Sequence, residues 1–184
     1  MSEMRAPKTA VERLVAFTGT DLEDLCDAAE DAIKAGGGFG WVVAPPRHIM
    51  EAYWRGVLLV PERRIFVARL DNTICGSAQL ARPPRNNEAQ SFAAQLTSNF
   101  IAPWARGHGL AKRIVLAVEE AARAAGFDIL NLDVRATQEA AIQLYESLGY
   151  QRWGVHPAYA RVAGVTLPGY FYYKRLTGED ASPQ

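Results

Sequence analysis

The sequence predicts a single α/β domain, and three observations carry this prediction. The chain has 184 residues, about the length of one domain, and 49% of them are hydrophobic while 22% are charged, as in ordinary folded proteins. β-rich runs and amphipathic helical patterns follow one another in the order β-α-α-β-β-β-α-β-α-β-β, with no internal repeat or linker. We expect the domain to span residues 11–177, between flexible ends at 1–10 and 178–184.

Runs rich in Val, Ile, Leu and aromatic residues predict the strands, at 11–17, 65–68, 74–78, 92–102, 130–134, 150–155 and 170–176. Asp71-Asn72 tolerates a tight turn and should join the second and third of these strands as a hairpin. Pro103 cannot donate to a β-ladder and marks the end of the fourth. Polar residues with prolines make Arg82–Gln90 a loop, and we expect another loop, with Pro157, Gly164 and Pro168, between the last two strands.

Apolar residues at helical spacing predict the helices, over 20–35, 49–57, 110–125 and 137–148. Thr20 and Glu23 match a capping box at the start of the first helix, which should run to the glycines at 36–38. Thr137 is the expected cap of the last helix. Gly126 and Gly149 follow the last two helices, where glycine is the preferred residue.

Charge and cysteine content exclude several classes of function. Twenty basic and twenty acidic side chains give no net charge, so the broad basic field of a nucleic-acid binder is missing. No apolar run is long enough for a membrane span, and the charged N-terminus does not fit a signal peptide. Cys26 and Cys75 form neither a disulfide scaffold nor a metal motif, so we expect a cytoplasmic protein without a metal.

A glycine-rich turn between a predicted strand and a predicted helix is the first candidate ligand site. It has the sequence Arg106-Gly107-His108-Gly109-Leu110-Ala111. Glycines let the backbone approach a ligand closely, and the free amides of the first helical turn stabilise an anion such as a pyrophosphate. The alternative is a glycine-rich connection without a ligand. The chain has no G-x-x-x-x-G-K-[ST] motif, and the glycines at 36–40 follow a helix rather than a strand, so neither standard nucleotide motif fits.

Two motifs in the chain resemble those of the GNAT superfamily of acetyl-CoA-dependent N-acetyltransferases. Arg106-x-x-Gly109-x-Ala111 is similar to the Q/R-x-x-G-x-G/A signature of that superfamily. Residues 141–150, AIQLYESLGY, are similar to its second motif, which follows the predicted strand with Leu132-Asp133-Val134. The resemblance implies one domain with a mixed, mostly antiparallel sheet flanked by helices, and acetyl-CoA as co-substrate.

Further segments resemble the tabtoxin-resistance-type branch of this superfamily. They are Phe39-Gly40-Trp41, Tyr53-Trp54, the hairpin with Gly76, residues 154–160 (GVHPAYA) and residues 171–176 (FYYKRL). This narrower resemblance implies a small-molecule amine as the acceptor, either amino-acid-like or toxin- or antibiotic-like.

The resemblance implies which residues bind CoA. They comprise the strand before the turn, the turn itself and the start of the last helix, namely Asn99, Phe100, Ile101, Arg106, Gly107, His108, Gly109, Leu110, Ala111, Gln138 and Ala141. Asn99, Phe100 and Ile101 would contribute backbone groups. Gln138 stands where many members have an asparagine that helps to hold the CoA arm.

Acetyl transfer to an amine requires a base, because an alkyl amine with a pKa of about 10.4 is charged at pH 7 and neutralising it costs about 4 to 5 kcal/mol. Asp133 is the candidate base: it shares a strand face with Asn131, and the branch has an aspartate at the matching position. Local hydrogen bonding at a strand end is the alternative role. Tyr145 is the acid that the resemblance implies for the CoA thiolate, and a core aromatic is its alternative.

The acceptor site is expected to involve Trp41, Gln95 and Tyr159. Gln95 stands where the branch usually has a glutamate, and an amide cannot accept a proton, so Asp133 would act alone. Three functions remain open: a small-molecule N-acetyltransferase, a CoA-binding module with little turnover, and an acetyltransferase for protein or peptide amines. No nucleic-acid or membrane partner is expected, and a homodimer through the C-terminal strands is one further hypothesis.

Overall fold

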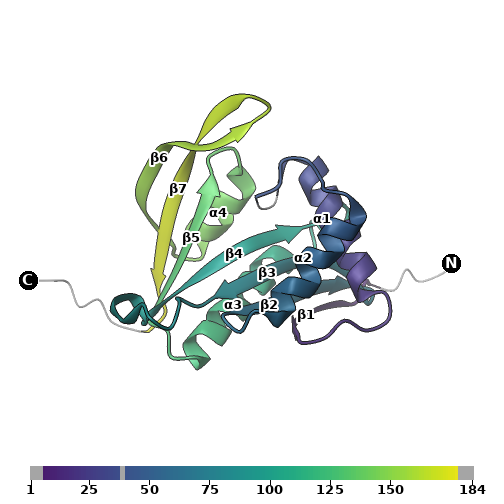
Figure 1. Cartoon of the computed structure of the whole chain (residues 1–184), viewed down its shortest axis with the longest axis horizontal. Coiled ribbons are helices and arrows are strands. Elements are labelled where there is room, and N and C mark those ends of the chain that lie inside the picture. Colours follow the sequence, from purple (N-terminus) through teal and green to yellow (C-terminus); the bar gives the residue numbers. More distant parts are fainter. Residues whose placement is uncertain (1–5, 38–39, 178–184) are drawn as a thin grey trace, which may run out of the picture. The chain divides into compact units, whose positions relative to one another are not determined.

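The computed structural model of the chain describes residues 6–37 and 40–177 and contains both helices and strands (Figure 1). The helices are α1 (Asp21–Lys34), α2 (Arg47–Leu59), α3 (Leu110–Ala124) and α4 (Glu139–Ser147), with short 3₁₀ turns at Glu88–Gln90 and Pro103–Ala105. The strands are β1 (Thr9–Leu14), β2 (Arg63–Leu70), β3 (Thr73–Ala81), β4 (Ala93–Ile101), β5 (Ile129–Arg135), β6 (Gln151–Val162) and β7 (Val165–Arg175). The predicted element order is confirmed.

The described strands form one seven-stranded sheet in the order β1-β2-β3-β4-β5-β7-β6. β4 and β5 run parallel, whereas β1 with β2, β5 with β7 and β6 with β7 run antiparallel. The sheet is therefore mixed and mostly antiparallel, and the predicted α/β domain with flanking helices is confirmed. No helix among the described residues is long and apolar enough to cross a membrane.

The domain divides into two compact units. The first comprises the described residues up to Gln79 together with Ser98–Val118, and the second comprises Leu80–Thr97 and the residues from Glu119 onward. β3, β4 and α3 each contribute to both units, because the boundaries fall within them.

Helices α1 and α2 supply the apolar core of the first unit. Leu25, Ala29 and Ile33 recur at three-to-four spacing along α1 and are buried, as the amphipathic pattern predicts. Trp54 of α2 is fully buried in the same cluster. The β2–β3 turn is built by Asp71 and Asn72, whose φ angles of 48° and 71° are typical of a tight hairpin.

Strands β3 and β4 approach each other closely in the first unit. A Cβ on Gly76 would lie 2.5 Å from the Phe100 carbonyl oxygen and 2.5 Å from Ile101 Cδ1, so only glycine fits there. Ser98 has a φ of 51°, a left-handed conformation that interrupts regular β geometry within β4. Asn99–Ile101 therefore follow a local distortion of the strand.

In the second unit, β5 separates a buried face from a partly open one. Leu130, Leu132 and Val134 are buried, while Asn131 and Asp133 alternate with them and remain half-buried. The parallel ladder with β4 pairs 93–95 with 129–131, and the antiparallel ladder with β7 extends over the whole of β5. The Asn131 carboxamide and the Asp133 carboxylate thus project from the same face of β5.

One predicted capping box and one predicted helix cap are wrong. Thr20 is the N-cap of α1, but its hydroxyl donates to Asp24 Oδ2 (3.2 Å) and makes no cap hydrogen bond, so the capping box is not formed. Gln138, not Thr137, is the N-cap of α4, and its side chain makes no cap hydrogen bond either. In both cases the backbone enters the helix without the side-chain bond that the motif suggested.

The loop predicted between the last two strands is also wrong, because β6 and β7 are longer than their sequence pattern. Pro157 lies in β6 at the edge of the sheet, where no ladder donor is required. Pro168 lies in β7 opposite an irregularity between His156 and Ala160. Only Ala163 and Gly164 form the turn, and both have positive φ.

The N-terminal end of the domain differs from the prediction. β1 begins at Thr9, inside the segment expected to be flexible. Residues 1–5, the tail 178–184, and Gly38 and Phe39 lie outside the described residues.

Candidate active site

The turn between β4 and α3 presents an exposed stretch of backbone in the first unit. Gly107 and Gly109 have φ angles of 83° and 71°, which other residues rarely adopt. α3 begins at Leu110, and the Arg113 amide donates to the Gly109 carbonyl (3.2 Å). The preceding amides of this first helical turn have no intrahelical acceptor and point out of the helix end. The predicted strand-to-helix turn is present, and the structure shows that both of its glycines are left-handed.

The charge around this turn favours an anion. The first turn of α3 contains no acidic residue, and it contains Lys112 and Arg113. The Arg113 guanidinium donates from Nη1 to Thr9 Oγ1 (2.6 Å), whereas Arg106 and Lys112 are exposed. His108 lies with Nδ1 3.2 Å from the Ala105 carbonyl oxygen. The helix dipole and these cations act in the same direction.

Asn99, Phe100 and Ile101 occupy the end of β4. The Phe100 and Ile101 side chains are buried, and the Ala102 amide that follows donates to the Cys75 carbonyl (2.8 Å). These residues can therefore offer only backbone groups and the Asn99 amide to a ligand.

Gln138 is the N-cap of helix α4, which carries Ala141 and Tyr145 in the second unit. Gln138 and Ala141 are half-buried, whereas Tyr145 is only 5% exposed. Its ring packs edge-on against Tyr150, with ring centroids 5.7 Å apart. Tyr145 is thus a buried aromatic residue on α4, and a short connection joins the end of β5 to the start of this helix.

Asp133 is the centre of a hydrogen-bonded triad in the second unit. Gln95 Nε2 donates to Asp133 Oδ1 (2.9 Å), and the Tyr159 hydroxyl donates to Asp133 Oδ2. Burial and this hydrogen bond raise the pKa of the Tyr159 phenol above its ordinary value, so Tyr159 stays protonated and remains a donor at neutral pH. An ionised carboxylate has about four acceptor positions, so Asp133 can still accept from a ligand.

The backbone at Gly169 fixes the Tyr159 ring. A Cβ at Gly169 would lie 2.1 to 2.6 Å from three atoms of that ring, so the ring occupies the space above the glycine. The Tyr159 ring also contacts Phe171 edge-on, with centroids 5.9 Å apart, and Trp153 packs against Phe171 at 5.5 Å. An aromatic wall therefore stands beside Asp133.

The structure thus joins three of the residues predicted for the acceptor site and its base: Asp133, Gln95 and Tyr159. Trp41 lies in the first unit, edge-on to Tyr53 at 4.9 Å. Sequence reasoning missed Gly169, because its importance arises from a ring 10 positions earlier on a paired strand. Only the register of β6 with β7, where His156 pairs with Gly169, could have indicated it.

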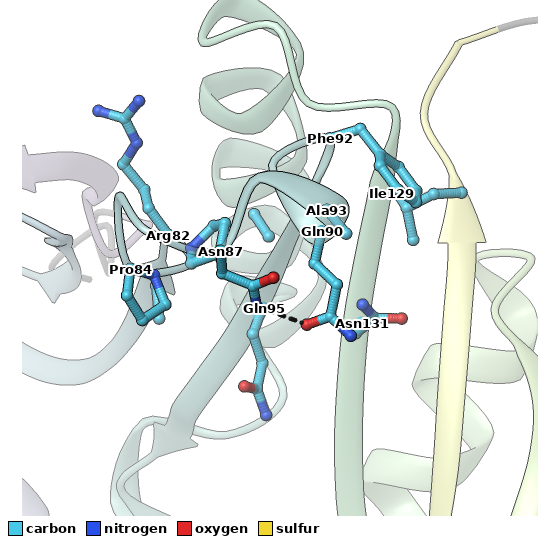
Figure 2. A pocket seen from close by; sticks show the side chains of 12 residues that line it. Arg82, Pro84, Asn87, Gln90, Phe92, Ala93, Gln95, Ile129 and Asn131 are labelled. Atoms are coloured by element: carbon cyan, nitrogen blue, oxygen red, sulfur yellow. Dashed lines mark hydrogen bonds between the residues drawn. The ribbon is translucent and has the colours of Figure 1, made fainter.

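A cavity of about 430 Å³ lies next to this triad in the second unit (Figure 2). It is lined by the β3–β4 loop and the first residues of β4 and β5, including Gln95 and Asn131. Within the described residues, no cluster of His, Cys, Asp and Glu is suited to hold a metal ion.

Comparison with known proteins identifies the family. The model of the acetyltransferase (GNAT) family matches residues 25–150. An uncharacterized N-acetyltransferase in the hisH-hisA intergenic region of Azospirillum brasilense is 67% identical over 128 residues, which cover 70% of this chain and 76% of that protein. The N-alpha-acetyltransferase RimI of Mycobacterium tuberculosis is 30% identical over 107 residues, 58% of this chain and 64% of RimI.

Solved structures share the fold at low sequence identity. The N-acetyltransferase of Staphylococcus aureus Mu50 superposes with a TM-score of 0.77 and 18% identity, covering 92% of this chain and 99% of that one. yncA of Salmonella typhimurium, solved with its cofactor acetyl-CoA, gives a TM-score of 0.74 at 16% identity over 96% of this chain and 98% of yncA. The chain therefore belongs to the GNAT family of acetyltransferases and is an N-acetyltransferase.

Proposed function

We propose that this N-acetyltransferase moves the acetyl group of acetyl-CoA to a primary amine on a small, amino-acid-like or toxin- or antibiotic-like molecule, as in the tabtoxin-resistance-type branch. The observation that carries the proposal is the half-buried Asp133 carboxylate, oriented by Gln95 and Tyr159 beside an aromatic wall. Small-molecule sites combine such apolar walls with a few fixed polar groups. Acetyl-CoA as the donor is supported by the family and by the yncA structure.

The donor would be held mainly by backbone groups. Its pyrophosphate would accept hydrogen bonds from the turn Arg106–Ala111, whose left-handed glycines expose the amides at the start of α3. Asn99, Phe100 and Ile101 would pair with the pantetheine arm through their backbone, and Gln138 and Ala141 would contact CoA from α4. A neutral protein can bind a polyanion in this way because the attraction is local.

The reaction would use one base and one acid. Asp133 would accept the proton that the ammonium group loses, and the freed lone pair would form the new C–N bond to the acetyl carbonyl carbon. The C–S bond of the thioester then breaks, and the Tyr145 hydroxyl would protonate the CoA thiolate. The second nitrogen proton leaves to solvent, solvent reprotonates the Tyr145 oxygen, and Asp133 releases its proton to solvent, so the products are the amide, CoA thiol and one proton.

Two conservative substitutions test these roles. Asp133→Asn keeps an acceptor for the Tyr159 hydroxyl but removes the base, and Tyr145→Phe keeps the ring but removes the acid. We expect each to lower kcat about a hundredfold with an amine panel and acetyl-CoA, measured as CoA thiol release. Asp128→Asn, a change at an exposed carboxylate just before β5, is the control and should leave the rate unchanged.

A CoA-binding module with little turnover is the second candidate, favoured by Gln95 in place of a carboxylate. It predicts tight acetyl-CoA binding by calorimetry and the same residual rate in wild type, Asp133→Asn and Tyr145→Phe. A third candidate, acetylation of a protein or peptide amine, is favoured by the similarity to RimI, which is named an N-alpha-acetyltransferase. Activity on peptides that exceeds activity on every small amine would select it.

The setting and assembly of the enzyme are part of the proposal. Both cysteines are free and buried, which fits a reducing cytoplasm. β6 is the outer strand of the sheet and exposes Trp153 and Val155, so a homodimer through this edge is our expectation. Light scattering on the eluting protein gives its mass in solution and decides between monomer and dimer.

A further inference from the structure

The cavity beside the Asp133 triad has the size of a small-molecule site. Its volume of about 430 Å³ falls within the range of roughly 300 to 1,000 Å³ that is typical of ligand pockets. In Figure 2 the β3–β4 loop lines one side of it, and the beginnings of β4 and β5 line the other. All of these residues belong to the second unit.

The polar part of the lining consists of neutral amides. Asn87, Gln90, Gln95 and Asn131 contribute carboxamides, while Pro83 and Phe92 are among the apolar lining residues. Arg82 is the one charged residue in the lining, but its guanidinium lies over the Phe127 ring, 5.5 Å from the centroid, and points away from the other side chains in Figure 2. The cavity therefore offers hydrogen bonds without a charge.

Several of these amides retain hydrogen-bonding capacity. Asn87 Nδ2 donates to Gln90 Oε1 (2.9 Å), which orients Gln90 and leaves the Gln90 amide group as a donor. Gln95 uses its nitrogen on Asp133 and keeps its oxygen as an acceptor. A ligand with both donors and acceptors would match this set, whereas an ionised group would lose its hydration without meeting an opposite charge.

The cavity is linked to the proposed base by two residues. Gln95 belongs both to the lining and to the Asp133 triad. Asn131 projects from the same face of β5 as Asp133, two residues earlier, which corresponds to about 7 Å along a strand. One small molecule that spans about 7 Å can therefore contact both the cavity and Asp133.

We propose that this cavity binds the far end of the acceptor, and that this end is an uncharged amide, such as a carboxamide or a peptide amide. The acceptor is then an amine joined, across about 7 Å, to a neutral amide rather than to a carboxylate. This inference rests on the proposed function, because it assumes that the amine reacts at Asp133.

Matched acceptors test the charge preference. Glycylglycinamide and glycylglycine have the same length, which suits the 7 Å span, but they end in an amide and in a carboxylate. We expect kcat/KM for the amide to be at least tenfold higher, with the difference mainly in KM. Equal values, or a preference for the carboxylate, would overturn the inference while leaving acetyl transfer itself in place.

Variants locate the preference in the cavity. Gln90→Ala, on an exposed part of the loop, and Asn131→Leu, which keeps the side-chain volume, should each raise KM for glycylglycinamide severalfold with little change in kcat. Glu88→Ala alters the same 3₁₀ turn at a residue outside the lining and should change neither constant. An unchanged KM in both cavity variants would contradict the assignment.

A non-reactive probe separates this inference from the proposed function. N-acetylglycinamide has no amine, so its binding does not depend on turnover. It should shift the side-chain amide NMR signals of Gln90 and Asn131 at millimolar concentration, and sodium acetylglycinate should not. If no amine is acetylated, the proposed function fails, and the probe result then decides alone whether the cavity selects neutral amides.

Discussion

Gln95 illustrates how a contact changes the meaning of a residue. From the sequence, Gln95 is an amide at a position where the tabtoxin-resistance-type branch usually has a glutamate. In the structure, this amide donates to Asp133 Oδ1 at 2.9 Å. A glutamate here would place two carboxyl groups within hydrogen-bond distance, and one of them would then have to hold a proton. The Gln95 amide instead donates a hydrogen bond to Asp133 and adds no second carboxyl group.

Gln95→Glu should therefore shift the pH dependence of the reaction. A like charge disfavours ionisation, so the pair would lose its second proton at a higher pH than Asp133 does alone. We expect the acid limb of the kcat/KM profile to move up by about one pH unit or more. Gln143→Glu, which adds the same charge at an exposed position on α4, should leave the limb in place; a shift of equal size there would point to net charge instead.

Tyr159 orients Asp133 through its hydroxyl and through the position of its ring. Tyr159→Phe removes only the donor, and Gly169→Ala places a methyl group within 2.1 to 2.6 Å of the ring and displaces it. We expect both to lower kcat/KM about tenfold, at similar melting temperatures for Tyr159→Phe and wild type. Full activity in Tyr159→Phe would mean that the hydrogen bond has no part in catalysis.

Sequence reasoning identified Asp133, Gln95 and Tyr159 separately, but not their contact. Asp133 could be placed on a strand face by alternation with Leu132 and Val134. Tyr159 lies in a segment predicted as a loop, so no pattern could bring it to β5. That contact depends on the length of β6 and on the register with β7, which are set by tertiary pairing.

At the scale of elements, the contact between β3 and β4 depends on one glycine. Gly76→Ala would place Cβ 2.5 Å from the Phe100 carbonyl oxygen, which belongs to the backbone and cannot rotate away. We expect a loss of about 1 to 3 kcal/mol in the free energy of unfolding, measured with urea. Gly56→Ala, in an exposed part of α2 with nothing within 4 Å of the added Cβ, should stabilise by up to about 1 kcal/mol. Equal changes in the free energy of unfolding for Gly76→Ala and Gly56→Ala would contradict the close approach of β3 and β4.

The turn before α3 should bind CoA through its backbone shape. Gly109 has a φ of 71°, and an alanine there would be strained by roughly 1 to 2 kcal/mol although its Cβ meets no neighbour. Gly109→Ala should therefore raise the acetyl-CoA Kd about tenfold in calorimetry. Arg106→Ala, which removes a side-chain charge only, should have a smaller effect; the reverse order would make the side chain the main phosphate ligand.

Element positions were predictable where periodicity is strong and uncertain where single residues decide. Alternating or three-to-four spaced apolar residues located β5, α1 and α3. Thr20 and Thr137 match capping preferences, but the Thr20 hydroxyl donates to Asp24 instead of capping, and Gln138 rather than Thr137 is the N-cap of α4. Pro157 is tolerated in a strand because β6 lies at the sheet edge, a fact that local sequence does not contain.

At the scale of the whole molecule, the even charge balance agrees with a protein whose charges are used locally. In the second unit, buried Glu119 accepts from Lys174 Nζ at 2.8 and 2.9 Å and from Arg123 Nη2 at 3.1 Å. A buried carboxylate is tolerated in the interior only when cations and hydrogen-bond donors of this kind compensate its charge. In the proposed function, attraction for CoA would likewise be confined to the start of α3 rather than spread over the surface.

Both thiols should be unreactive in the native protein. Cys75 is fully buried, and burial raises the pKa of its thiol to about 11, while burial also raises the pKa of Cys26. A thiol reagent at pH 8 should therefore titrate neither cysteine until denaturant is added, when two thiols per chain appear. Rapid labelling of the folded protein would contradict the burial of these side chains.

This unreactivity makes CoA thiol release the most direct test of the central claim, that Asp133 is the base of an acetyl-CoA-dependent amine acetyltransferase. The measurement compares wild type with Asp133→Asn across pH, with acetyl-CoA and an amine panel that includes glycylglycinamide. We predict amine-dependent release in wild type, with an acid limb that disappears, together with about 99% of the rate, in Asp133→Asn. The same amine-dependent rate and pH profile in both proteins would contradict the account.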